Sequence, residues 1–518
     1  MARLRASPYP MSQLPSRLGV VGAGTMGAGI AQLGCLAGLE TLLHDPVPGA
    51  LERGEYSIRM GLAKGAERGR WSDDEERAAG ERLRLCERVE DLSECELVIE
   101  AAPERPELKR ELFERLSDIC GDDAVLASNT SSILVSSLAA AAAHPENVVG
   151  MHFFNPPPLM RLLEVIAAAQ TSERALAVAR AVGEAMGKTV IVASDGPGFL
   201  VNRCGRPVNG EALRLLQERV ATLEQIDRIA RLGGGFRMGP FELMDLVGID
   251  VGYEVARSFN DQSFGEPRWK PSILQSRMVA AGTLGRKTGK GWYSYEEGKP
   301  HRPDDDDPPE AGGGEGQSVV ITGEGALADA LRERARAAGF ELGGSQPELI
   351  VHAAPGGIST SRETPLALLC ADRSLAAHAI PGAVGFHLLP PIGRLVELTR
   401  LPDTRTEAAE KAEGFFGALG LHHEWVNDAP GLVLGRLVCQ LVNEALFAIG
   451  EGVGSAEDVD AGTTLGLNHP RGPVAWGREI GFEHVLATLD GLWDERREER
   501  YRAAPLLRRV VATGESIS

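Results

Sequence analysis

The architecture of the chain can be worked out from one stretch, Leu18-Gly-Val-Val-Gly-Ala-Gly-Thr-Met-Gly27. Its first four residues are mostly apolar and predict a short strand, while the apolar pattern of residues 28–39 predicts a helix. Three glycines at GxGxxG spacing separate the two elements. Strand, glycine turn and helix in this order are typical of the first βα unit of a dinucleotide-binding, or Rossmann, sheet.

Each residue of this turn has a physical role in binding a dinucleotide. Gly22 permits the tight turn, Gly24 lets the backbone approach a pyrophosphate, and Gly27 lets helix and strand pack closely. Thr25 and Met26 lie in the glycine turn just before the helix, whose N-terminus favours the negative charge of the pyrophosphate. We therefore expect these five residues to contact the cofactor.

An acid follows at the position where the ribose is expected. The next apolar run, residues 41–43, leads to Asp45, 23 positions beyond Gly22. A carboxylate there accepts hydrogen bonds from ribose hydroxyls and repels a 2′-phosphate, and no arginine follows it at once. The sequence therefore favours NAD over NADP.

Strands and helices continue to alternate up to a final apolar run at residues 190–192, which predicts a doubly wound α/β sheet. Polar residues follow three of the strands: Glu104, Ser131 and His152. The carboxyl ends of parallel strands share one edge, so we expect these residues to lie close to the nicotinamide. The alternative for Ser131 and its neighbours is a polar turn that caps a helix.

Residues 148–166 suggest acid–base chemistry. An apolar strand delivers His152, a Pro-rich turn follows at residues 156–158, and a second apolar run carries Glu164. Because the second run returns along the first, His152 and Glu164 form a candidate pair in which the carboxylate fixes the imidazole tautomer and makes it a better base. The alternative is a core histidine beside a surface glutamate.

The sequence pattern changes after residue 195. Residues 1–195 are expected to form the Rossmann domain, and residues 196–297 show helical patterns with few strand signals. Residues 298–316 contain an Asp run, paired prolines and a Gly run, so we expect a mobile linker too polar to pack. Residues 317–428 and 429–518 repeat the earlier pattern of α/β and helical segments.

The repeat is an internal duplication whose second copy lacks residues expected to take part in the chemistry. Landmarks recur at an offset of 233, such as Glu211 with Glu444 and Asp227 with Asp460. In the second copy no acid stands in the place of Asp45, and Gly435 matches Asn202. We interpret this half as structural; the alternative is a regulatory nucleotide site.

Composition excludes several classes of function. The chain has 518 residues, a net charge of −19, and seven cysteines without a CxxC pair or a Cys/His cluster. These features argue against nucleic-acid binding, a disulfide framework and a metal site. Residues 1–16 lack the apolar core of a signal peptide, and no apolar run is long enough to span a membrane, so we expect a cytoplasmic protein.

The ordered motifs resemble those of the L-3-hydroxyacyl-CoA dehydrogenases over residues 17–295. They are the glycine turn, Ser128-Asn-Thr-Ser-Ser132, His152-Phe-Phe-Asn-Pro156, Glu164, Pro197-Gly-Phe-Leu-Val-Asn-Arg203 and Gly239-Pro-Phe-Glu-Leu243. The duplicated length resembles the long bacterial form of the family, which oxidises 3-hydroxyadipyl-CoA in phenylacetate breakdown. The resemblance implies an α/β Rossmann domain and an all-helical C-terminal dehydrogenase domain, followed by a degenerate second Rossmann-like domain and a second helical domain.

The resemblance also implies roles for single residues. His152 would be the general base that removes the 3-hydroxyl proton, and Glu164 would orient it. Ser131 and Asn202 would hydrogen-bond the substrate.

Further contacts are implied for the cofactor and for CoA. Glu104, Lys109 and Asn155 match positions that contact NAD, and Ser57 and Lys64 match positions that contact CoA. The alternative for Lys64 is a solvated helix lysine.

A distal substrate carboxylate would need a cation, for which Arg206 and Arg268 are candidates by position. The alternative for both is a surface salt bridge.

Two questions of organisation and substrate stay open in the sequence. Helical domains pair in dimers of the family, so the second copy here either pairs with the first inside one chain or supports a homodimer. The resemblance favours 3-hydroxyadipyl-CoA as the substrate. The alternatives are a 3-hydroxybutyryl-CoA or general β-oxidation dehydrogenase and, more distantly, a non-catalytic NAD-binding scaffold.

Overall fold

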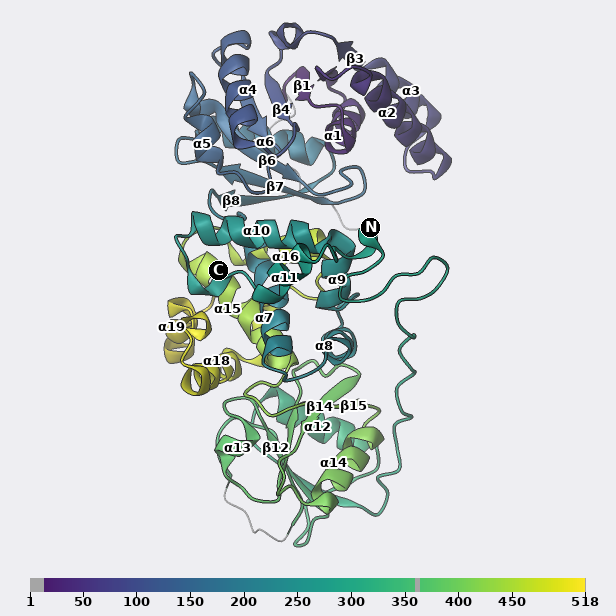
Figure 1. The fold of residues 1–518 in the computed structure, drawn as a ribbon, viewed down its shortest axis with the longest axis vertical. Helices are drawn as coiled ribbons and strands as arrows, with labels where there is room; N and C mark the ends of the chain where they lie inside the picture. The colour runs from purple at the N-terminus through teal and green to yellow at the C-terminus, as the bar shows by residue number, and fades with distance from the viewer. Residues whose placement is uncertain (1–13, 359–363, 518) are drawn as a thin grey trace. The chain divides into compact units, whose positions relative to one another are not determined.

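The computed structural model describes residues 14–358 and 364–517 and divides into two compact units (Figure 1). Unit 1 comprises the chain up to Val201 together with Gly452–Leu467. Unit 2 comprises Asn202–Glu451 and the chain from Asn468 onward. The expectation that residues 1–16 contain no signal peptide falls almost entirely outside the described residues.

Unit 1 is built on an eight-stranded sheet with the strand order β3-β2-β1-β4-β5-β6-β7-β8. Neighbouring strands are parallel except for β6 and β7, which are antiparallel. Strands β1, β4, β5 and β6 are almost wholly buried, as expected where helices cover both faces. The strands are β1 Arg17–Val21, β2 Glu40–His44, β3 Leu83–Cys86, β4 Leu97–Glu100, β5 Val125–Ser128, β6 Val148–Phe153, β7 Leu162–Ala167 and β8 Thr189–Ser194.

The helices of unit 1 that precede its last strand connect strands of this sheet, which confirms the predicted doubly wound fold. Packing is close: a Cβ on Gly34 of α1 would lie 2.5 Å from Leu18 of β1. The helices are α1 Thr25–Leu36, α2 Ala50–Glu67, α3 Asp73–Glu81, η2 Val89–Leu92, α4 Pro106–Ile119, α5 Val135–Ala139, η3 Pro145–Asn147 and α6 Glu173–Ala185.

One helix of unit 1 comes from the second copy of the repeat. Helix α16, Ala456–Leu467, packs on β7 and β8. Glycines allow the close approach: a Cβ on Gly462 would lie 2.8 Å from Val201, and one on Gly466 would lie 2.8 Å from Leu162. The backbone N–H of Ser194 also donates to the carbonyl of Val453. The second copy therefore supplies part of the compact unit that contains the first Rossmann sheet.

Unit 2 contains the second Rossmann-like sheet, in the order β10-β9-β11-β12-β13-β14-β15, with β13 and β14 antiparallel like β6 and β7. Its strands are β9 Ser318–Thr322, β10 Glu341–Leu342, β11 Leu349–His352, β12 Leu366–Leu369, β13 Val384–His387, β14 Leu395–Thr399 and β15 His422–Trp425. Its helices are α12 Ala326–Ala337, α13 Leu375–His378 and α14 Thr406–Ala418.

The rest of unit 2 is helical. Helix α7 begins at Val201, where the first segment of unit 1 ends, and continues into unit 2. Among the residues that the structure describes, no helix is long and apolar enough to cross a lipid bilayer. The helices are α7 Val201–Gln217, α8 Leu223–Arg228, η4 Ile229–Gly233, α9 Pro240–Val247, α10 Ile249–Gln262, η5 Pro267–Trp269, α11 Ile273–Ala280, η6 Arg286–Thr288, α15 Leu434–Gly450, α17 Pro473–Ile480, α18 Phe482–Arg496, η7 Glu499–Tyr501 and α19 Pro505–Thr513.

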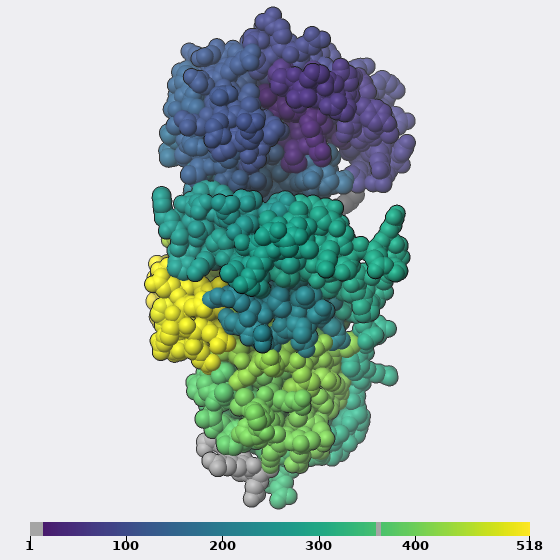
Figure 2. All heavy atoms as spheres, in the orientation of Figure 1, coloured from purple at the N-terminus to yellow at the C-terminus, as the bar shows by residue number. Residues whose placement is uncertain are grey.

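The two helical copies pair within the chain through reciprocal buried ion pairs. Arg203 Nε lies 2.8 Å from Glu444 Oε1, and Arg436 Nε lies 2.7 Å from Glu211 Oε1. Both arginines and both glutamates are related by the offset of 233. Figure 2 shows the C-terminal segment, in yellow, directly beside the teal residues of the first helical copy. Of the two expected arrangements, the pairing inside one chain is therefore present.

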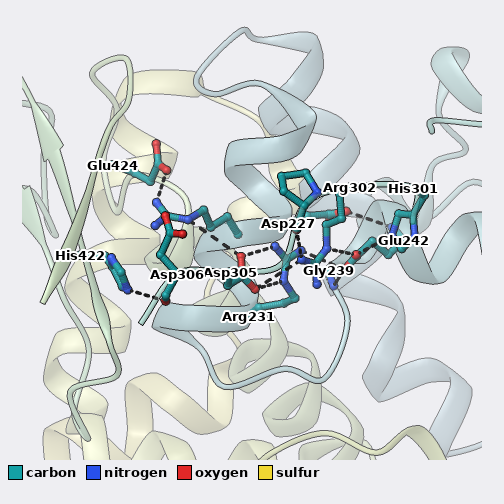
Figure 3. Close-up of polar contacts among 12 residues, drawn as sticks. Asp227, Arg231, Gly239, Glu242, His301, Arg302, Asp305, Asp306, His422 and Glu424 are labelled. Carbon is teal, nitrogen blue, oxygen red and sulfur yellow. Dashed lines mark hydrogen bonds and ion pairs between the residues drawn. The ribbon is translucent and has the colours of Figure 1, made fainter. Parts of the chain in front are cut away.

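The expectation that residues 298–316 are too polar to pack is wrong for the part that Figure 3 shows. His301 and Arg302 both contact Glu242, at 2.9 and 2.5 Å, and Asp305 contacts Arg231 at 2.8 Å. Glu242 and Arg231 are themselves buried and 2.9 Å apart. Because the segment's charges complement buried charges of the helical copy, these ion pairs hold it in place.

Candidate active site

The β6–β7 hairpin brings His152 and Glu164 together. The two residues are direct partners in the antiparallel register, and His152 Nδ1 lies 3.0 Å from Glu164 Oε2. Glu164 is fully buried, which excludes the alternative of a surface glutamate. Because a carboxylate accepts hydrogen bonds, Nδ1 carries the proton in this pair, and a neutral ring then has its lone pair on Nε2.

Glu164 is fixed by a second set of contacts. Its Oε1 accepts hydrogen bonds from the backbone N–H groups of Leu200, at 2.7 Å, and Val201, at 3.1 Å. Val201 is the first residue of α7. The carboxylate therefore joins the imidazole to the start of a helix and has little freedom to turn away.

Two aromatic rings lie beside the imidazole of His152, and its second nitrogen is available to a ligand. Phe154 and Phe199 lie with ring centroids 4.5 and 6.1 Å from the His152 ring. Nε2 makes no hydrogen bond with any residue that the structure describes. The site therefore offers a base that is oriented by the carboxylate at its Nδ1, the ring's one hydrogen-bond partner among the described residues.

The glycine turn has the geometry that a pyrophosphate requires. Gly22 has a φ of +104°, and a Cβ there would lie 2.7 Å from the carbonyl of Ala101. A Cβ on Gly27 would lie 1.7 Å from the carbonyl of Gly22. Gly24 instead faces open space and caps α1 without a side-chain bond, so the N–H groups of the first turn are left for a ligand.

Asp45 is held beside this turn. Its Oδ2 accepts a hydrogen bond of 2.8 Å from the N–H of Ala23, and its Oδ1 accepts one of 2.8 Å from Val47. Thr25 is exposed and Met26 is partly exposed at the start of α1. The arrangement fits the pyrophosphate and ribose of NAD.

A buried charge network supports the loop after β5. Lys109 is almost fully buried and lies 2.8 Å from Glu100 and 3.1 Å from Glu104. Burial alone would raise the pKa of Glu104, but Lys109 and the hydroxyl of Thr130 lower it below the usual value. Lys109 therefore lies beneath the loop and keeps Glu104 ionised. Glu100 did not stand out in the sequence, where it is only the last residue of a strand.

Glu104 in turn positions the loop that carries Ser131. Its Oε1 accepts hydrogen bonds from the N–H groups of Ser131, at 3.0 Å, and Ser132, at 3.1 Å. Asn129 of the same loop accepts a 2.8 Å hydrogen bond from the N–H of Phe153, the residue after His152. Ser131 is exposed. The Ser131 loop is thus tied to the end of β6, and Asn129 is a positioning residue that sequence reasoning missed.

The remaining predicted contacts lie on accessible positions of their elements. Asn155 follows the end of β6 and is exposed. Ser57 and Lys64 are exposed on α2 and are seven residues apart, so they share one helix face. Asn202 is the second residue of α7, next to the Val201 that binds Glu164.

The two candidate arginines differ. Arg268 forms ion pairs with Glu266, at 3.0 Å, and Glu444, at 2.9 Å, so its charge is already neutralised and it is not free to take the predicted role of binding a substrate carboxylate. Arg206 forms no ion pair with any residue in the described ranges. The expected alternative of a surface salt bridge therefore does not apply to Arg206.

The second copy preserves the framework of this site without its chemistry. Glu397 accepts hydrogen bonds from Val433 and Leu434, as Glu164 does from Leu200 and Val201, but its Oε1 lies 3.8 Å from His387 Nδ1. His387 is buried, and a Cβ on Gly435 would lie 2.5 Å from its ring. The ring therefore occupies the space next to the position that matches Asn202.

Comparison with known proteins agrees with this geometry. The NAD-binding domain of 3-hydroxyacyl-CoA dehydrogenases matches residues 17–196, and their C-terminal domain matches residues 198–295 and again 431–516. The chain belongs to the 3-hydroxyacyl-CoA dehydrogenase family. It is accordingly an NAD-dependent oxidoreductase with a duplicated C-terminal domain.

Relatives of two lengths occur among the 3-hydroxyacyl-CoA dehydrogenases that the chain resembles. The 3-hydroxyadipyl-CoA dehydrogenase of Escherichia coli K12 is 33% identical, over 94% of this chain and 96% of its own length. A probable 3-hydroxybutyryl-CoA dehydrogenase of Deinococcus radiodurans is 40% identical over 54% of this chain and 100% of its own. A crystal structure described as 3-hydroxybutyryl-CoA dehydrogenase from E. coli K12 has a TM-score of 0.80 and 32% identity, covering 96% of this chain and 98% of its own.

Proposed function

We propose that the protein oxidises (S)-3-hydroxyadipyl-CoA to the 3-oxoacyl-CoA in phenylacetate breakdown, in the cytoplasm. The full-length similarity to the E. coli 3-hydroxyadipyl-CoA dehydrogenase supports this, because it includes the degenerate second copy that the D. radiodurans relative lacks. A second candidate substrate is 3-hydroxybutyryl-CoA, since the equally long E. coli crystal structure is described with that substrate.

In this proposal His152 is the general base. Its Nε2 takes the proton of the 3-hydroxyl group while Glu164, 3.0 Å behind Nδ1, stabilises the imidazolium that forms. NAD, when bound, accepts the hydride from C3 and so supplies the redox chemistry. In the reverse direction the same nitrogen returns the proton to the 3-oxo group.

Other residues hold the reactants. Ser131 and Asn202 hydrogen-bond the substrate, and Ser57 and Lys64 contact CoA from the exposed face of α2. Gly22, Gly24, Thr25, Met26, Gly27 and Asp45 hold the pyrophosphate and ribose, with Glu104 and Asn155 towards the nicotinamide. For Lys109 we propose an indirect contribution through Glu104, because its side chain is buried.

We further propose that residues 1–195, 196–297, 317–428 and 429–518 are the domains, joined by residues 298–316. The domain matches at residues 17–196, 198–295 and 431–516 support these boundaries.

The His152→Ala variant tests the mechanism. We expect turnover to fall by about 10²–10⁴-fold with little change in NADH affinity, because the base acts on the proton and not on the cofactor. The measurement is NADH formation with 3-hydroxyadipyl-CoA, together with NADH binding followed by fluorescence. His387→Ala in the second copy is the matched control and should leave turnover unchanged. Near-normal turnover of His152→Ala contradicts the proposed base.

A further inference from the structure

Helix α7 forms one wall of a cavity of about 490 Å³ in unit 2. Arg206 and Asn209 of α7 line it, together with Ala256 of α10, Trp269 of η5 and Gln275 of α11. All of the residues that line the cavity belong to unit 2. Its lining combines apolar residues with many charged and polar ones, including both candidate arginines, Arg206 and Arg268, and the acidic residues Glu498 and Glu499.

Arg206 differs from the other arginines that line this cavity. Arg268 pairs with Glu444, Arg214 with Glu498, and Arg500 with Glu211, but Arg206 has no carboxylate partner among the described residues. Its Nε is enclosed and makes no hydrogen bond in this part of the chain. Burial lowers the pKa of Arg206 to about 10, so the group is still a cation at neutral pH.

An enclosed cation without a counter-charge costs free energy. A carboxylate at the cavity wall would offset that cost, and a guanidinium binds a carboxylate through two parallel hydrogen bonds. Phe259 helps to hold the guanidinium of Arg206 in place, since the Cζ of Arg206 lies 5.0 Å from the centre of the Phe259 ring. The arginine is therefore prepared for an anionic ligand that the chain itself does not provide.

The position of Arg206 on α7 indicates which anion that is. Arg206 follows Asn202 by four residues and so lies on the same face of the helix, about 6 Å further along its axis. C3 and the terminal carboxyl carbon of an adipyl chain are three bonds apart, a reach of the same order as one helical turn of ~5.4 Å. A substrate held by Asn202 near C3 would bring a terminal carboxylate towards Arg206.

We propose that Arg206 binds the terminal carboxylate of the acyl chain and so selects dicarboxylyl-CoA substrates over monocarboxylyl ones. This inference rests on the proposed function and specifies which residue recognises the far end of the substrate. Arg206 is a specificity residue in this scheme and takes no part in moving the proton.

The test compares two six-carbon substrates, 3-hydroxyadipyl-CoA and 3-hydroxyhexanoyl-CoA, which differ only in a terminal carboxylate or methyl group. The wild type should have the higher kcat/KM with the adipyl substrate. In Arg206→Leu the ratio of the two kcat/KM values should fall by about 10- to 100-fold, because a hydrogen-bonded charge pair is lost. The hexanoyl value should stay the same or rise. Arg206→Lys keeps the positive charge but loses the paired N–H donors of the guanidinium. Its substrate ratio should lie between those of the wild type and Arg206→Leu.

Lys270→Ala is the matched control, because Lys270 lines the same cavity but is exposed. It should leave the substrate ratio unchanged. Equal losses on both substrates in Arg206→Leu, or an unchanged ratio, overturn the role of Arg206 while the proposed function stands. A wild type that oxidises the hexanoyl but not the adipyl substrate overturns the proposed substrate itself.

Calorimetry on the wild type gives a second measurement that needs no variant. Adipyl-CoA and hexanoyl-CoA lack the 3-hydroxyl group and are not oxidised, so their binding can be compared directly. Tighter binding of adipyl-CoA supports the carboxylate site, and equal binding of the two overturns it.

Discussion

Glu164 shows how one side chain can serve both chemistry and architecture. One of its oxygens orients His152, and the other accepts two backbone N–H groups at the start of α7. A glutamine in its place can keep one of these functions but not both, because its NH₂ group donates. If the amide donates to Nδ1, the proton of the neutral ring moves to Nε2 and the base is lost.

We therefore expect Glu164→Gln to lower kcat by about 10²–10⁴-fold while NADH affinity is preserved. The measurement is steady-state kinetics combined with a fluorescence titration of NADH. Glu397→Gln is the control at the matching position of the second copy, since Glu397 makes the same two backbone contacts. A similar loss of kcat in both variants would show that the effect is structural.

The pairing of His152 with Glu164 was predictable because both belong to one hairpin of short sequence separation. The contacts of Asn129 and Glu100 were not predictable, since their partners come from other elements. Asn129 bonds to Phe153, 24 residues away, and Glu100 reaches Lys109 on α4. A single sequence carries no signal for such contacts, because each residue alone is typical of a turn or a strand end.

At the scale of elements, the segment around residues 301–305 is held by charge. Burial alone would raise the pKa of Glu242, but the N–H of Gly239 and the side chains of Arg302, His301 and Arg231 lower it to about 2. Composition predicted a loose linker here, because polar residues usually remain in water. The sequence pattern did not reveal that buried charges of the helical copy would be its partners.

This network predicts a pH dependence of stability. Since the pKa of Glu242 falls from 4.5 to about 2 on folding, its contribution is complete above 4.5 and is lost as the pH falls towards 2. Glu242→Gln should be less stable than the wild type at pH 7, and the difference should shrink below pH ~4.5. Urea unfolding at several pH values measures this. Glu296→Gln, which changes an exposed ion pair, should follow the wild type at every pH.

For the molecule as a whole, the main finding is that α16 of the second copy packs on the hairpin that carries His152 and Glu164. The duplication and the two Rossmann-like sheets were predictable from repeated motifs. The position of α16 was not, because an apolar helix face does not specify which of two similar sheets it covers. The second copy thus contributes to the catalytic unit without contributing a reacting group.

A larger side chain at Gly466 should therefore impair catalysis, although Gly466 lies far from His152 in the sequence. A Cβ there would lie 2.8 Å from Leu162 and 3.2 Å from Phe154, whose ring contacts His152. We expect Gly466→Val to lower kcat by about tenfold, because small displacements of a catalytic group are costly. The control is Gly233→Val at the matching position of the first copy, which contacts Leu434 in unit 2. Unchanged kcat in Gly466→Val, or an equal loss in both variants, would contradict this prediction.

The reciprocal ion pairs between the helical copies have a consequence for the protein in dilute solution. Because Arg203, Glu444, Arg436 and Glu211 belong to one polypeptide, their association does not depend on protein concentration. A free partner could dissociate on dilution, whereas a tethered one stays at a high effective concentration. The second helical copy therefore stays a permanent partner of the first, although no acid stands in the place of Asp45 in the second half of the chain.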